Sequence, residues 1–278
     1  MGIAKAISGV MILLAAVSTS VYANPNFTHL EGNPGLRSAS ALVLDAKGDV
    51  IYGKDVDTVR PIASITKLIT AMVVLDSGVD LDEKITITRA DRDLIRLTGS
   101  RLDFGATLSR RELILLAVMS SENRAAMALG RTYPGGMERF VDQMNRKARS
   151  LGMGNSRFAD PAGLKADNVS TAKDLARMVA AAEDYPLITQ ASTTTRMEVR
   201  PYSNRGPLTY GNTNRLLKNK NWDIELSKTG YINEAGRCLV MQANIEGEDV
   251  SIVLLNSFGK LTPFGDSNRL RKWLLTNS

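Results

Sequence analysis

The 278-residue sequence predicts an α/β fold of the α+β type, in which an antiparallel sheet from both chain ends packs against an inserted lobe of helices. Three observations support this prediction. Apolar and polar residues alternate near the start of the chain, helical spacing of apolar residues dominates the middle, and strand-like runs return after about residue 193. The first and last strands can then pair, and a site is expected in the cleft between sheet and lobe.

The first predicted element is a β-hairpin. Residues 39–52 alternate between apolar and polar around a turn at Asp45-Ala46-Lys47-Gly48. Apolar residues at helical spacing then predict a series of helices, at residues 65–73, 113–119, 124–131, 137–151 and 172–182. The middle of the chain is therefore expected to form the helical lobe.

Further strands are predicted in the last part of the chain, at residues 224–232, 237–245 and 250–257. The last two are joined by the polar turn Glu246-Gly247-Glu248-Asp249. A short helix is predicted at 268–275, with Leu270, Trp273 and Leu274 on one face. We expect this face to cover the sheet rather than to hold the protein to a membrane.

Residues 1–23 have the pattern of a cleavable secretory leader. Lys5 supplies the positive N-terminal region, an apolar run extends from Val10 to Val17, and Val21-Tyr22-Ala23 fits a cleavage site before Asn24. The apolar run is shorter than the roughly 20 residues that cross a bilayer, so an uncleaved anchor is the less favoured alternative. We therefore expect export and a mature domain at residues 24–278.

The single histidine, His29, and the single cysteine, Cys238, exclude several kinds of site. One imidazole cannot build a zinc site from two or three histidines, and one thiol cannot form an internal disulfide or a C-x-x-C pair. Because His29 lies in a predicted tail, a nucleophilic hydrolase would need another base. We expect no metal or other cofactor, and we expect Cys238 to be a buried small hydrophobic residue.

The formal net charge of +6 does not by itself identify a partner. Residues 89–111 contain six arginines, but acidic residues interrupt them and Phe104 is the one aromatic residue in this stretch. A solvated surface is therefore predicted here, and not a nucleic-acid interface.

Three short motifs fall into this outline: Ser64-Ile65-Thr66-Lys67 (S-x-x-K), Ser121-Glu122-Asn123 (S-x-N) and Lys228-Thr229-Gly230 (K-T-G). S-x-x-K also occurs at 170–173, where helix capping explains it, and at 257–260, where Gly259 favours a turn. The first S-x-x-K differs because it opens an apolar helix. The order and context of the three motifs therefore indicate one composite site.

The S-x-x-K motif can supply a nucleophile and its base without histidine. Ser64 is predicted at the N-terminal end of a helix, where unpaired N–H groups favour negative charge, and Lys67 lies on the same helix face. An ordinary lysine is protonated at neutral pH, so Lys67 must be desolvated or lie near another cation, which Lys228 can supply. Neutral Lys67 can then take the proton from Ser64 to form an acyl-enzyme.

With their flanking residues, the motifs resemble a known family. The segments 60–68, 119–126, 228–230 and 235–241 resemble the serine penicillin-recognising enzymes, the superfamily of D-Ala-D-Ala carboxypeptidases and serine β-lactamases, and most closely their periplasmic D-alanyl-D-alanine endopeptidases. The resemblance implies a β-lactamase/transpeptidase-like fold. It also implies a periplasmic enzyme that binds penicillin and hydrolyses D-alanyl-diaminopimelate cross-links of peptidoglycan through an acyl-enzyme on Ser64.

The resemblance also implies roles for the other motif residues. Ser121 would relay a proton to the departing amine, and Asn123 would hold substrate or Lys67; the structural alternative is that both merely cap the helix that starts near Glu122. Lys228 and Thr229 would bind a substrate carboxylate; the alternative is an exposed lysine on an edge strand followed by a bend.

The resemblance also implies that the end of the strand carrying K-T-G binds the acyl group. Gly230 would let the acyl chain lie against the strand, and the N–H groups of Ser64 and Tyr231 would form the oxyanion hole. Many relatives have threonine where this chain has Ile232, so one hydroxyl for carboxylate binding is missing from the pattern.

Other functions share the same motifs. The enzymatic alternative is a β-lactamase or a carboxypeptidase that releases terminal D-alanine. The non-enzymatic alternative is a module that senses β-lactams or peptidoglycan without turnover. Expected partners are peptidoglycan stem peptides and β-lactams, with no nucleic acid. We expect no stable membrane anchor, because the chain ends soon after Trp273.

Overall fold

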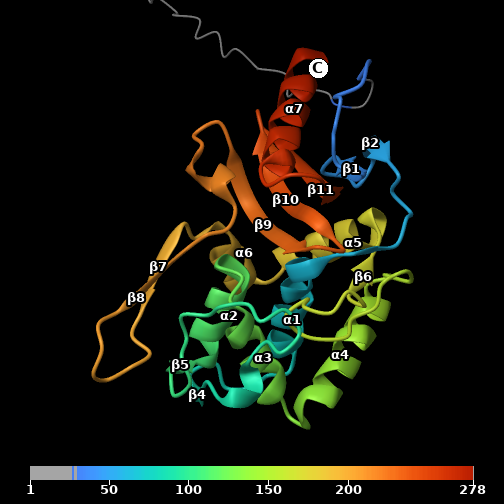
Figure 1. Ribbon diagram of the computed structural model, residues 1–278. Helices are drawn as coiled ribbons and strands as arrows, with labels where there is room; N and C mark the ends of the chain where they lie inside the picture. The colour runs from blue at the N-terminus through green and yellow to red at the C-terminus, as the bar shows by residue number, and fades with distance from the viewer. Residues whose placement is uncertain (1–26, 28–29, 278) are drawn as a thin grey trace, which may run out of the picture.

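The computed structural model describes residue 27 and residues 30–277 (Figure 1). The predicted leader at 1–23 and His29 lie outside the described residues, as does the predicted cleavage site. Within the described part of the chain, no helix combines the length and apolar character that a membrane span requires.

A five-stranded antiparallel sheet forms the upper half of the molecule in Figure 1, with the order β2-β1-β11-β10-β9. Its strands are β1 (Ser40–Leu44), β2 (Val50–Lys54), β9 (Asp223–Ile232), β10 (Gly236–Ile245) and β11 (Glu248–Ser257). β1 pairs with β11, with Leu42 opposite Val253. The prediction that strands from the two chain ends form one sheet is therefore confirmed.

The two faces of this sheet cover different cores, because side chains alternate along each strand. Val43, Met241 and Ile252 face the C-terminal helix α7 (Thr262–Asn277) and pack with its buried Leu270 and Leu274. Leu42, Val240 and Val253 point the other way, into the core of the helical lobe. α7 begins six residues before the predicted start at 268, and Pro263 lies in its first turn, where its missing N–H costs no hydrogen bond.

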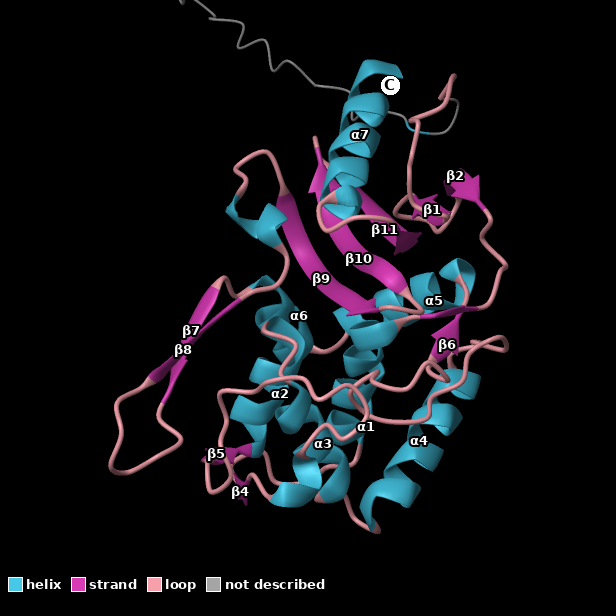
Figure 2. Cartoon of the chain, in the orientation of Figure 1, coloured by secondary structure: helices cyan, strands magenta, loops and turns pink. Residues whose placement is uncertain are grey.

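The helical lobe lies below the sheet and contains six α-helices (Figure 2). They are α1 (Lys67–Asp76), α2 (Arg110–Met119), α3 (Asn123–Arg131), α4 (Gly136–Ser150), α5 (Ala172–Glu183) and α6 (Pro186–Thr193). Five match the predicted helices. The sixth, α6, was not predicted; it starts at a proline and packs against α2 and β9.

Short two-stranded sheets connect the loops of the lobe, and they were not predicted from the sequence. They are β3 (Arg60–Pro61) with β6 (Val169–Ser170), β4 (Lys84–Thr86) with β5 (Thr107–Ser109), and β7 (Arg196–Val199) with β8 (Leu208–Gly211). β7 and β8 form a hairpin that projects beside α2 and α6 in Figure 1.

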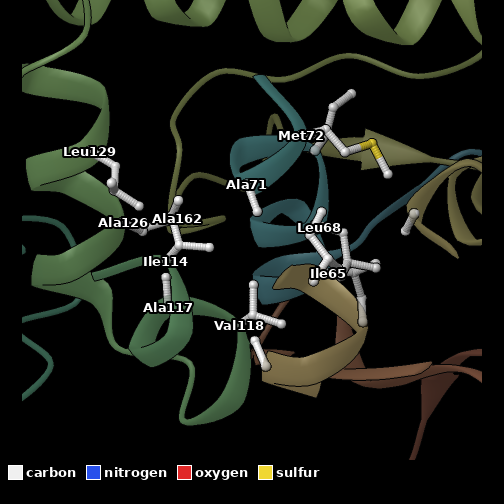
Figure 3. Close-up of a cluster of buried hydrophobic side chains, with 14 of the residues drawn as sticks. Ile65, Leu68, Ala71, Met72, Ile114, Ala117, Val118, Ala126, Leu129 and Ala162 are labelled. Atoms are coloured by element: carbon white, nitrogen blue, oxygen red, sulfur yellow. The ribbon is translucent and has the colours of Figure 1, made fainter. Parts of the chain in front are cut away.

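Helix α1 is the centre of the lobe. Every residue from Lys67 to Val74 is buried, so the helix has no solvated face in this stretch. Figure 3 shows Leu68 and Ala71 of this helix within a cluster that includes Ile114 and Val118 of α2. A helix that is surrounded on all sides places its polar residues in the core, which matters for Lys67.

One sequence-based expectation about charge needs correction. The arginine-rich stretch was predicted to be a solvated surface, yet Arg110 is only 2% exposed. Its guanidinium forms an ion pair with Glu83 and donates to Thr132 Oγ1 and to the carbonyl of Asp80. Arg110 was misassigned because its partners come from loops and helices that the local charge pattern does not reveal.

The interface between α7 and the sheet yields a stability prediction. Leu274→Ala removes a fully buried side chain, so it should lower the free energy of unfolding by about 3 kcal/mol in urea denaturation. Leu94→Ala is the matched control, because Leu94 is 73% exposed and its loss should change stability by less than about 0.5 kcal/mol. Equal effects of the two variants would contradict the packing described here.

Candidate active site

Ser64 lies where the sheet meets the helical lobe. It is part of a short 3₁₀ turn, η2 (Ala63–Thr66), that leads directly into α1. Gly230 of β9 passes so close that a Cβ atom there would lie 2.8 Å from the carbonyl oxygen of Ile62 and 3.1 Å from Ser64 N. The glycine of K-T-G is therefore required by the approach of the two backbones.

Lys67 lies one turn after Ser64 and is completely buried. Its Nζ is 2.8 Å from Ser64 Oγ, 2.8 Å from Asn123 Oδ1 and 2.6 Å from the carbonyl oxygen of Ala162. These acceptors come from η2, α3 and the loop before β6, so three separate segments position one amine. An ammonium group in this position donates its three hydrogens to three oxygens.

Burial lowers the pKa of Lys67 from 10.5 to about 7. The negative charges of Asp160, Glu122 and Asp93 act in the opposite direction, but the loss of hydration outweighs them. A large fraction of Lys67 is therefore neutral at physiological pH.

Lys228 is also buried, and its pKa is held well below its ordinary value, first by burial and then by the charge of Lys67. From the sequence, either desolvation or a neighbouring cation, with Lys228 as that cation, could lower the pKa of Lys67. The structure identifies desolvation as the leading cause of the lowered pKa of Lys67.

Ser121 lies between the two lysine-bearing segments. It occupies the loop between α2 and α3 in a left-handed conformation with φ of 60°, and its Oγ accepts a hydrogen bond of 3.1 Å from Lys228 Nζ. The capping alternative is wrong for this serine, because Glu122 is the N-cap of α3 and accepts from Arg124 N. Asn123 is the first residue of α3 and its Oδ1 accepts from Lys67.

The side chains of Lys228 and Thr229 face opposite sides of β9. Lys228 points towards the lobe, and Thr229 points to the opposite face, where its hydroxyl donates to Thr213 Oγ1 at 2.6 Å. The alternative of an exposed edge lysine is therefore wrong. Tyr231 is 48% exposed, and the guanidinium carbon of Arg237 lies 3.7 Å from its ring centroid.

Ile232 and Cys238 belong to the core rather than to the chemistry. Ile232 is 5% exposed and packs with the residues of the helical lobe, so the missing threonine is replaced by an apolar core contact. Cys238 is 2% exposed, and burial raises the pKa of its thiol to about 11. The prediction that Cys238 is a buried small hydrophobic residue is confirmed.

The loop at residues 160–165 contributes groups to which the sequence analysis gave no role. Asp160 is buried, and its carboxylate accepts from the backbone N–H groups of Ala162, Leu164 and Lys165 at 2.8, 3.1 and 2.8 Å. The loop is thus held with the Ala162 carbonyl against Lys67. Gly163 has φ of 74°, and a Cβ there would lie 2.0 Å from Ala63 O, so this loop also packs directly on η2.

A cavity of about 560 Å³ opens from these residues. The lining includes the motif residues Ser64, Ser121, Asn123, Thr229, Gly230 and Tyr231. It continues past them to residues of η4 (Arg215–Lys218) and to the turn that precedes α7. The three motifs therefore share one cleft between the sheet and the lobe.

A family model described as D-alanyl-D-alanine carboxypeptidase, serine peptidase family S11, matches residues 28–259. The chain belongs to this family. Its members are serine peptidases, so this chain is a serine DD-peptidase.

Individual comparisons agree with the family. The peptidase is 48% identical over 268 residues to a D-alanyl-D-alanine endopeptidase of Pseudomonas aeruginosa, covering 96% of this chain and 86% of the relative. Its structure is similar to the Streptomyces K15 DD-transpeptidase, with a TM-score of 0.81 and 27% identity over 88% of this chain and 100% of that chain. It is also similar to penicillin-binding protein D2 of Listeria monocytogenes in a cefotaxime-bound form, with a TM-score of 0.74, 28% identity and the same coverage. The β-lactamase/transpeptidase-like fold is confirmed.

The pKa of Lys67 predicts how the peptidase responds to pH. If neutral Lys67 removes the proton of Ser64, the rate of acylation by penicillin should rise with pH and reach half its maximum near pH 7. At pH 6 the rate should be about one tenth of the plateau. Stopped-flow acylation between pH 5.5 and 9 measures this, with tryptophan fluorescence as the check that the fold persists. A rate that does not change over this range would contradict the pKa.

The Asp160 loop predicts a second effect on acylation. Asp160→Asn keeps the side-chain volume but weakens the acceptors of three N–H groups, so the Ala162 carbonyl should shift away from Lys67 and acylation should slow at least about tenfold. Asp167→Asn is the matched control, because Asp167 is exposed in the same loop. Equal acylation rates in both variants would show that Asp160 does not position the site.

Proposed function

We propose that this peptidase is a periplasmic serine DD-endopeptidase that hydrolyses D-alanyl-diaminopimelate cross-links of peptidoglycan through an acyl-enzyme on Ser64. The single observation that carries the proposal is the buried Lys67 Nζ, 2.8 Å from Ser64 Oγ, with a pKa of about 7. This pair supplies a nucleophile and a base in a chain whose one histidine lies outside the described residues.

In the first step, neutral Lys67 accepts the proton of Ser64 while the serine oxygen attacks the D-alanyl carbonyl carbon. The two hydrogens left on the amine donate to Asn123 Oδ1 and Ala162 O, so the lone pair is directed at Ser64. One side chain, that of Asn123, and one backbone carbonyl, that of Ala162, therefore orient the base. This arrangement accounts for the hydrogen-bonding partners of Lys67.

The oxyanion formed by the attack would be stabilised by the N–H groups of Ser64 and Tyr231. The close approach of β9 to η2 at Gly230 supports this assignment, because it brings the two backbones to within contact distance. Each such donor contributes roughly 2.7 to 4 kcal/mol of transition-state stabilisation.

Collapse of the tetrahedral intermediate breaks the bond to the diaminopimelate nitrogen, which must receive a proton. Ser121 is suited to deliver it, because its hydroxyl faces the catalytic cleft and accepts from Lys228 Nζ. The proton that Lys67 took up in the first step is proposed to reach this nitrogen by way of Ser121. Water then attacks the ester, with Lys67 again as base, and frees Ser64.

The Thr229 hydroxyl is proposed to bind the carboxylate that lies next to the scissile amide, and Lys228, buried on the other face of β9, is proposed to act on this carboxylate through its charge. The Thr229 hydroxyl is on the exposed side of β9. Its partner on β10 is Leu239, and Arg237 lies two residues before Leu239, so its side chain faces the same side as Thr229. A carboxylate in this position receives a hydroxyl and a positive charge. The D-centre of diaminopimelate carries such a carboxylate.

The preference for cross-links over terminal D-alanine is supported by the 48% identical relative named D-alanyl-D-alanine endopeptidase. A cleft of about 560 Å³ that continues past Thr229 also has room for a leaving group larger than alanine. β-Lactam binding is supported by the similarity to a penicillin-binding protein with bound cefotaxime. Export by removal of residues 1–23, giving a mature domain at 24–278, completes the proposal.

The proposal is tested with cross-linked muropeptide dimers and pentapeptide monomers offered separately to the purified protein. The wild type should cleave dimers, and Ser64→Ala should lose this activity together with covalent labelling by penicillin. Ser170→Ala is the control serine, because Ser170 begins the second S-x-x-K sequence yet lies outside the cleft. Trimming of monomers without cleavage of dimers would identify a carboxypeptidase instead, and acylation without turnover of either would identify a sensing module.

A further inference from the structure

The catalytic cavity has a positively charged end, of which the reaction steps above use only Arg237. Beyond Thr229 its lining includes four cationic side chains, those of Arg215, Lys218, Arg237 and Lys260. No aspartate or glutamate is among the described residues that line it. A cavity lined by one sign of charge attracts ligands of the opposite sign.

No carboxylate of the described residues neutralises these cations, whereas other arginines of the protein are paired. Arg60, Arg110 and Arg131, for example, each form an ion pair with an aspartate or glutamate. Among the described residues, no carboxylate oxygen lies within 4.0 Å of Arg215, Lys218 or Lys260. Their charges are therefore available to an anionic ligand.

The position of this end follows from the chain. Thr229 donates to Thr213, and Thr213 leads within two residues to Arg215 at the start of η4. On the other side, Arg237 is the second residue of β10 and pairs with Ser257, and Lys260 follows in the turn before α7. The charged end thus extends from the Thr229 side of the cleft, where the leaving group departs.

Apolar side chains border the same region. Leu261 is 55% exposed and Phe264 is partly exposed, and both line the cavity together with Tyr231. Charged groups at the rim and apolar surfaces between them suit an extended peptide that carries several carboxylates, rather than a small ion.

We propose that Arg215, Lys218 and Lys260 form a second anionic subsite, which binds carboxylates of the leaving stem peptide and favours cross-linked substrates over terminal D-alanine. This subsite rests on the proposed endopeptidase function. Diaminopimelate is a dicarboxylic acid, and the stem peptide that contains it carries further carboxylates beyond the one assigned to Thr229. Long-range attraction to these groups strengthens binding of the second strand without a part in bond cleavage.

The test compares kcat/KM for muropeptide dimers and for pentapeptide monomers in the full-length protein. Arg215→Gln combined with Lys218→Gln should lower the dimer-to-monomer ratio of kcat/KM about tenfold, mainly through KM, and adding Lys260→Gln should lower it further. Lys220→Gln is the matched control, because this exposed lysine is close in sequence but does not line the cavity. Equal losses on both substrates would overturn the proposal.

A second set of measurements separates carboxylate binding from other causes. Dimers whose leaving-strand carboxylates are amidated should be cleaved more slowly by the wild type and should be insensitive to the Gln substitutions. The preference for unmodified dimers should also decline as salt rises from 50 to 500 mM, because exposed charges are screened. An unchanged ratio with amidated dimers would show that the cations recognise something else.

The subsite can be tested even if the endopeptidase proposal fails. In that case wild-type protein would not cleave dimers, but Ser64→Ala should still bind dimers about tenfold more tightly than monomers in calorimetry. The Arg215, Lys218 and Lys260 substitutions should remove this difference. Equal affinity of Ser64→Ala for dimers and monomers would overturn the subsite whatever reaction the wild type performs.

Discussion

The chemistry of this peptidase depends on an amine held inside a hydrophobic helical core. Helix α1 is surrounded on all sides, so Lys67 at its first turn loses its hydration, and its pKa falls to about 7. Apolar packing around the helix therefore acts on catalysis as directly as the polar residues do. Three oxygens from different segments then replace the lost water and fix the direction of the amine. A core of this kind must be complete before the site can function.

The second constraint is the close contact between backbones around Ser64. Gly230 approaches η2 from the sheet, and Gly163 approaches it from the loop that carries Ala162. Neither position has space for a Cβ atom without movement of η2. The sheet, the nucleophile and the loop are thus held in one arrangement, so the distances at the site follow from packing between the two halves of the molecule.

The sequence was sufficient to predict the order of the main elements, the pairing of both chain ends in one sheet and the three motifs. These features are local: hydrophobic period, turn residues and short spacings identify them. The contribution of Asp160 was not predictable, because its carboxylate binds backbone N–H groups, which leave no pattern of side chains. Arg110 and α6 were missed for a related reason, since their burial depends on partners distant in the sequence. The cause of the low pKa of Lys67 likewise required knowledge of burial.

The two buried lysines affect each other's protonation. Repulsion between Lys67 and Lys228 is reciprocal, so whatever favours the charged form of one favours the neutral form of the other. In the proposed binding mode, a carboxylate beside Thr229 would stabilise charge on Lys228, and a charged Lys228 opposes the charged form of Lys67. In that mode, the arrival of an anionic substrate would favour the neutral amine that the nucleophile needs. Electrostatic recognition and activation of the base are in this way two consequences of one arrangement of charges.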